Sequence, residues 1–317
     1  MSRRYALLAL PLLMVAGCAQ MNQEPAARRD RATMNTPERF ATSVEAADHA
    51  VETALGRMQA FEHLAAREDT AIGYALGGNA PAQLQPASTS VAELTGRVLA
   101  PAFTALGDYG HILAQAAAGI PIQAKESPSG TDLAESARRA LDQLRTAANL
   151  NLPTAVRDAG LAAITSLADL PEHMTKNRGS RVAMAEMVSA AEPQVKALTV
   201  MLQVVLGANA ESGARNAIRT RRLALDASHA RFLSAVRADR TAGPAERYGI
   251  FRAVAELREG DPAPGTLAQL YTLLASLSAA HDALDEGAAD ADAKVAGFEA
   301  AVQRLTALGE QTRRAGQ

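Results

Sequence analysis

The residues of this chain that could do chemistry are few. The 317 residues include one cysteine, Cys18, and six histidines, and the net charge is -2. The sequence has no HExxH zinc motif, no GxSxG nucleophile elbow, no Walker A loop and no GxGxxG phosphate loop. These absences predict that the chain has no catalytic residues and is not an enzyme.

Two Asp-x-x-His pairs are the best candidates for metal ligands. They are Asp108 with His111, and Asp226 with His229. A spacing of three places both members of a pair on one helix face. Ferritin-like di-metal bundles use two Glu-x-x-His pairs and two further glutamates. Here aspartate replaces glutamate and no suitable extra glutamate pair is evident, so we expect no metal and no cofactor.

A methionine-rich segment raises the question of copper. It comprises His173, Met174, Met184 and Met187. Thioether and imidazole groups suit Cu(I), but methionine is also a common filler of helical cores. The segment is interpreted as core, with a copper site as the alternative.

Four arginines lie close together, at positions 215, 219, 221 and 222. Such a stripe is typical of a solvated helix face, and the alternative is a contact with an anionic partner. Aromatic residues are only 3% of the chain. Because single-stranded nucleic acids are usually held on aromatic platforms, near-neutral charge and few aromatics argue against a nucleic-acid partner.

Two histidines fall on apolar helix seams. His281 lies in line with Leu277 and Leu284, and His229 lies in line with Leu225. A histidine that faces a core is usually neutral and hydrogen-bonded to a neighbouring helix. A ligand site or a pH-sensitive contact between helices is the alternative.

The N-terminus carries the strongest signal. Arg3 and Arg4 precede the apolar run 5–17, which is too short to span a bilayer but typical of a signal-peptide core. The run ends in Val15-Ala16-Gly17-Cys18. This ending resembles the lipobox of bacterial lipoprotein signal peptides.

The resemblance implies that residues 1–17 are a signal peptide and that Cys18 becomes the lipidated N-terminus. In Gram-negative members of this class an Asp after the cysteine retains the protein at the inner membrane, and here the position is Ala19. The implied location is therefore the outer membrane, facing the periplasm, if the organism has one. Residues 18–35 are expected to form a flexible, lipid-anchored tether.

The rest of the chain predicts an all-α fold. Apolar residues recur at three- and four-residue steps, with capping signals such as Thr36-Pro37 and the capping box Ser90…Glu93. We expect a long helical hairpin over 36–125 and an antiparallel bundle over 126–317, or one domain that includes both. The predicted helices cover 36–76, 90–118, 131–149, 153–170, 181–208, 211–241, 244–258, 266–286 and 289–313.

The last two predicted helices should pack against each other. Leu277 and Leu284 belong to the first seam, and Val295, Phe298 and Val302 to the second. A short acidic turn joins the helices, and short turns make neighbouring helices antiparallel.

The function that these features favour is structural or protein-binding. The chain is expected to be a lipid-anchored helical bundle whose partners are the membrane and a second envelope protein. A periplasmic small-ligand or metal-binding module is the alternative. Residues 98–124 carry Asp108 as their only formal charge, which leaves a membrane-active helical hairpin as a weaker hypothesis beside a buried central helix.

Overall fold

The computed structural model describes residues 35–79, 89–178, 184–209, 211–285 and 289–315. The predicted signal peptide, Cys18 and all but the last residue of the predicted tether lie outside these residues. Thr36–Gln317 form one compact unit.

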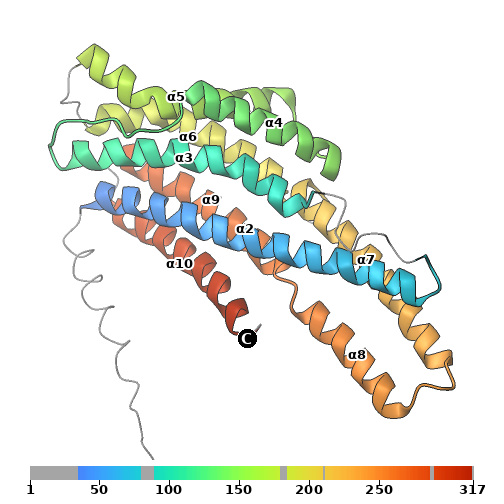
Figure 1. The fold of residues 1–317 in the computed structure, drawn as a ribbon. Coiled ribbons are helices and arrows are strands. Elements are labelled where there is room, and N and C mark those ends of the chain that lie inside the picture. The colour runs from blue at the N-terminus through green and yellow to red at the C-terminus, as the bar shows by residue number, and fades with distance from the viewer. Residues whose placement is uncertain (1–34, 80–88, 179–183, 210, 286–288, 316–317) are drawn as a thin grey trace, which may run out of the picture. The chain divides into compact units, whose positions relative to one another are not determined.

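The described residues form an all-α fold, as predicted, and no strand occurs among them. Figure 1 shows the helices in chain order. Their bounds are α2 Thr36–Ala75, α3 Val91–Ala117, α4 Gly130–Ala148, α5 Thr154–Arg178, α6 Met184–Leu206, α7 Gly213–Ala238, α8 Pro244–Glu259, α9 Ala263–Asp285 and α10 Ala291–Ala315.

Local capping chemistry sets several helix ends. The Ser90 hydroxyl accepts a hydrogen bond from the Glu93 amide at 2.9 Å and so caps α3, as the sequence predicts. Ser129 caps α4 in the same way. That helix ends at Asn149 in the left-handed conformation with φ 47°, a role that asparagine tolerates better than most residues.

Two predicted helix boundaries are wrong, and both involve proline. The predicted end before Pro171 is incorrect, because α5 continues to Arg178 with Pro171 buried inside it. The apolar face of α5 runs on through Leu167, Leu170 and Met174, and this packing outweighs the lost backbone hydrogen bond. The predicted helix start at residue 266 is three residues late, since α9 already begins at Ala263 and includes Pro264.

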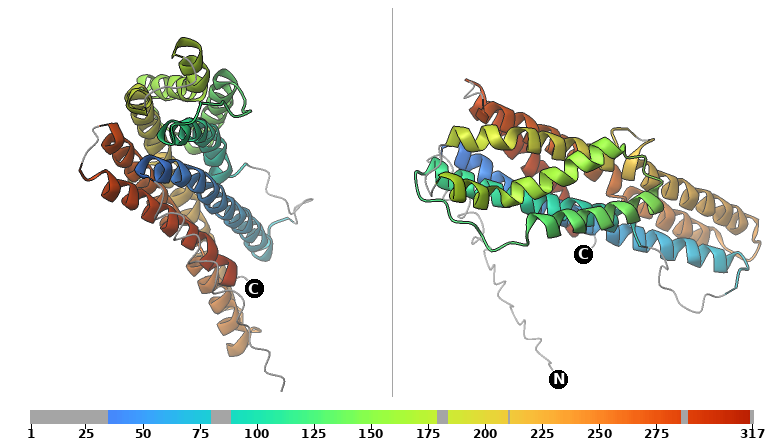
Figure 2. Two further views of the ribbon diagram at one scale, coloured as in Figure 1. Left: turned by 90° about the vertical axis from the view of Figure 1, so that its left-hand side faces the viewer. Right: turned by 90° about the horizontal axis from the view of Figure 1, so that it is seen from above.

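The helix α3 lies at the centre of the unit. It packs against α2, α4, α5, α6 and α7, and Figure 2 shows it among these helices. Val98, Phe103, Leu106 and Ile112 on it are buried. The predicted buried central helix is therefore confirmed. Among the described helices, none has the length and apolar character needed to span a membrane.

The C-terminal hairpin forms as predicted. The helices α9 and α10 pack against each other, and α10 also packs against α2. The five predicted seam residues are all buried in one core. Arg39 on α2 forms a forked pair with Glu299 on α10, both N–O distances being 3.0 Å.

A second, smaller cluster lies beyond the main core. Ala65 and Ile72 near the end of α2 pack with Leu225 of α7, and Phe61, Phe232 and Leu257 cover them. There α7 and α8 project from the main body alongside the last turns of α2 (Figure 1). We call residues 213–260, which comprise α7, α8 and their connection, the arm.

Candidate functional site

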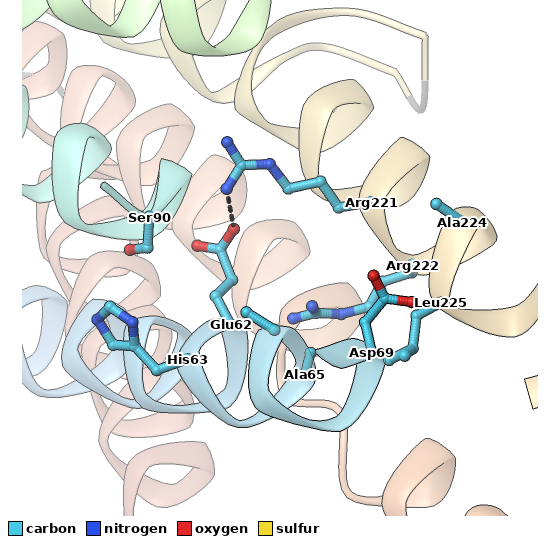
Figure 3. Close-up of a pocket in the computed structure, with 10 residues that line it drawn as sticks. Glu62, His63, Ala65, Asp69, Ser90, Arg221, Arg222, Ala224 and Leu225 are labelled. Carbon is cyan, nitrogen blue, oxygen red and sulfur yellow. Dashed lines mark hydrogen bonds and ion pairs between the residues drawn. The ribbon is translucent and has the colours of Figure 1, made fainter. Parts of the chain in front are cut away.

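A polar pocket of about 300 Å³ lies where the arm joins the body. It is bounded by α2, the N-terminus of α3 and α7. Figure 3 shows its charged side chains, among them Glu62, Asp69, Arg221 and Arg222. Charged groups of α2 and α7 meet there beside the N-terminus of α3, and this pocket is the candidate site.

Glu62 is the central group of this pocket. Its side chain is only 4% exposed. Its Oε2 accepts a hydrogen bond from the Ala92 amide at 2.8 Å, and its Oε1 accepts from Arg221 Nη1 at 3.1 Å and more weakly from the Val91 amide at 3.4 Å. The first amides of a helix have no partner within the helix and carry its positive dipole end. A buried carboxylate at this point therefore holds α3, α2 and α7 together.

Arg222 forms a second link at the same junction. Its Nε lies 2.7 Å from Asp261 Oδ2, and its guanidinium lies 4.4 Å from the centre of the Phe61 ring. Both members of the ion pair are mostly buried. This pair ties α7 to the start of α9 while the stacking ties it to α2.

The arginine stripe predicted as a solvated face mainly makes contacts within the protein. Arg221 and Arg222 pair as above, and Arg215 donates to the Leu267 carbonyl at 3.2 Å. Arg219 also has an interaction partner. The stripe is therefore part of the interface between the arm and the body. Because these arginines have partners within the protein, they do not support the alternative of an anionic partner.

The two Asp-x-x-His pairs do not converge on a common site. Asp108 accepts from the Ser127 hydroxyl at 2.8 Å, while His111 contacts Gln115 at 3.0 Å. Burial raises the pKa of the Asp108 carboxyl above its usual range, against the opposing effect of the Ser127 hydrogen bond. Asp226 pairs with Arg258 at 2.8 Å. No group of three His, Cys, Asp or Glu residues placed to hold a metal occurs in the part of the chain that the structure describes.

His229 has a more unusual position. It is fully buried, and its Nε2 lies 3.4 Å from Glu68 Oε1 on α2. That is an ion-pair distance if the ring is protonated, but neither ring nitrogen makes an aligned hydrogen bond among the described residues. The predicted hydrogen bond to a neighbouring helix is thus replaced by this looser contact.

The methionines are divided between core and groove. Met174 and Met187 are buried in the main core, and Met184 packs against it, while His173 is exposed. A groove of about 580 Å³ runs between α5 and α6. Leu167, Leu170 and Met174 are among its apolar lining residues, and Asp169, His173 and Gln194 are among its polar ones.

The chemistry available at the Glu62 pocket is binding and bracing. Its best-placed charges already neutralise one another, and none of them is paired with a nucleophile. Sequence reasoning missed Glu62, although a signal existed: it falls in line with Met58 and Ala65 on the buried seam of α2.

Comparison with protein-family models, curated proteins and solved structures found no match.

Replacing Glu62 with Gln is expected to lower the free energy of unfolding by about 2 kcal/mol. The amide group retains one acceptor oxygen but removes the charge that faces Arg221 and the α3 amides, and hydrogen bonds to charged groups contribute about 1.5–3 kcal/mol. Urea unfolding measures the loss. The matched control is Glu256→Gln, because Glu256 pairs with Arg252 on an exposed surface, where pairs contribute about 0–1 kcal/mol. Equal losses in the two variants would contradict the role given to Glu62.

Proposed function

We propose that this chain is a lipid-anchored helical protein of the bacterial cell envelope that acts by binding another envelope component. The observation that carries the proposal is the Val15-Ala16-Gly17-Cys18 ending of the apolar run, with Cys18 the only cysteine. Two or more acyl chains on one residue provide a stable anchor. With Ala19 after the cysteine, the proposed location is the outer membrane facing the periplasm, if the organism is Gram-negative.

The arrangement of the described helices supports a binding role over catalysis. The charged residues at the base of the arm are engaged in internal contacts that fix its position. Beyond them the arm exposes large apolar side chains, with Tyr248 68% and Phe251 61% exposed. Exposed aromatic residues on a projecting element favour an interaction surface.

Replacing Cys18 with Ser is expected to abolish membrane attachment and to leave an uncleaved precursor. Without the thiol no acyl group can be attached, and the lipobox resemblance implies that cleavage follows lipidation. Cell fractionation with immunoblotting measures both the location and the size of the product. A Ser136→Ala variant controls for expression, because this serine is exposed on α4 and lies outside the predicted signal peptide. Mature, membrane-bound Cys18→Ser protein would contradict the proposal.

A second function, a periplasmic small-ligand module, is favoured by the groove between α5 and α6. Its volume of about 580 Å³ falls within the usual range for ligand sites, about 300–1,000 Å³. Native mass spectrometry of the purified protein tests this alternative directly. A bound small molecule that is lost when Ala190, an exposed residue of the groove, becomes Phe would favour it over the binding of an envelope component.

A further inference from the structure

The helix α8 is the least supported helix of the arm. Its principal neighbour is α7, and Val254 is its only buried residue. Ile250, Val254 and Leu257 share one helix face, on which Val254 is buried and Leu257 packs against the small cluster. A second apolar seam, which includes Tyr248, Phe251 and Ala255, follows the same helical spacing on a more exposed side.

The arm is also the basic part of the molecule. Residues 213–260 carry ten arginines and five acidic residues, a net charge of +5 in a chain whose total is -2. At its far end, residues 230–255 hold five arginines against Asp239 and Glu246. Four of these five arginines are exposed: Arg231, Arg237, Arg240 and Arg252.

We propose that the far end of the arm, residues 230–255, binds the surface of an anionic phospholipid membrane. Arginines near such a surface are attracted to its anionic headgroups, and Tyr and Phe side chains insert at the level of the headgroups. Together these two kinds of interaction give a weak contact with the membrane surface. It becomes effective when an anchor holds the chain near a membrane, and in this respect the inference rests on the proposed function.

A lipid surface fits these residues better than a protein groove does. Neither Tyr248 nor Phe251 lines any of the cavities described above, and α8 stands out from the body rather than within a recess (Figure 1). A projecting element of this kind suits a flat, deformable partner. The glutamates of α8 limit the charge available there, so the arginines at the end of α7 and in the connecting loop supply most of the attraction.

The absence of tryptophan from the chain allows a direct test. The experiment uses residues 18–317 with Cys18 replaced by Ser. This variant retains every described contact, because the compact unit begins at Thr36. Circular dichroism first checks that it is helical. In this background Phe251→Trp gives a single emission probe, and its emission should shift to shorter wavelength with vesicles of phosphatidylglycerol and phosphatidylcholine but not with phosphatidylcholine alone.

Three controls make the result specific. Ile120→Trp places the probe at another exposed apolar position, after the end of α3 that lies away from the arm in Figure 1, and should show no shift. Adding Tyr248→Ser to the Phe251→Trp protein should weaken vesicle binding at least about tenfold, which corresponds to ~1.4 kcal/mol. Raising the salt from about 0.1 M to about 1 M should also weaken binding, because it shortens the Debye length from about 10 Å to about 3 Å.

Equal shifts at both probe positions, or no shift at either, would overturn the inference. The alternative occupant of this surface is an acidic protein. A photo-crosslinking residue at position 251 of the full chain in cells distinguishes that partner from a membrane. A discrete protein adduct there, with no shift on anionic vesicles, would also overturn it and assign the surface to an acidic protein. The protein in the vesicle experiment carries no acyl chain, because Cys18 is replaced, so its outcome does not depend on the lipidation of Cys18.

Discussion

Truncation of Phe298 to Ala is expected to lower the free energy of unfolding by about 3–5 kcal/mol, the usual cost of removing a fully buried phenylalanine ring. Phe298 lies on α10 with no exposed surface, and its ring centre is 5.8 Å from that of Phe40 on α2. The loss combines the transfer of the ring out of the core with the cavity left among α2, α9 and α10. It would be a large share of the 5–15 kcal/mol that holds an ordinary domain together.

Urea unfolding of the variant measures this loss, and the chain offers a matched control. Phe251→Ala removes the same ring from a position that is 61% exposed, and surface substitutions usually change stability by about 0.5 kcal/mol or less. A double-mutant cycle with Phe40→Ala should give a coupling energy of about 0.5–1.5 kcal/mol for the ring pair. Similar losses at positions 298 and 251 would contradict the packing of α10.

Acidification is expected to destabilise the protein through His281. This side chain is fully buried on α9, and its Nε2 forms a 2.9 Å hydrogen bond with the Tyr109 hydroxyl of α3. Desolvation by burial lowers its pKa to about 4, against about 6.5 for an exposed histidine. Between these values the unfolded chain binds more protons than the folded one, so stability is present above pH 6.5 and is lost as the pH falls. The loss amounts to about 1.4 kcal/mol at pH 5.5 and about 3 kcal/mol at pH 4.

The measurement compares urea midpoints of the wild type and His281→Leu at pH 8 and pH 5.5. The substitution removes the hydrogen bond to Tyr109 at both pH values, so that cost cancels in the difference between them. The wild type should lose about 1.4 kcal/mol more than the variant on acidification. Asp48 and Asp108, whose pKa values burial raises, act in the opposite direction in both proteins. An equal loss in the two proteins would show that His281 is not the sensor.

The sequence predicts most of the helices because their determinants are local. The recurrence of Phe40, Val44, Val51 and Met58 gives α2 its buried face, and Ser90 marks the start of α3. The burial of His281 was predictable for the same reason, since it falls between Leu277 and Leu284. Patterns of this kind identify which face of a helix is buried without any knowledge of its neighbour.

The partners of the charged residues could not be predicted in this way. Glu62 meets Arg221 and the amides of α3 only because α2 and α7 cross at the start of α3. The interpretation of the arginine stripe as a solvated face was wrong for this reason. The predicted helix end before Pro171 was wrong for a related reason. Packing against neighbouring helices stabilises a helical turn that proline alone disfavours.

The sharing of α2 between the main core and the small cluster gives the protein two levels of resistance to opening. The small cluster holds only Ala65, Ile72 and Leu225 as buried apolar residues, so its amide hydrogens should exchange with solvent through a local opening that leaves the main core intact. The first half of α2 remains packed against α3 and α10 during such an event. The part of the arm from Leu225 onward can therefore open and reclose, while the start of α7 stays packed because its Ala214 and Ile218 belong to the main core.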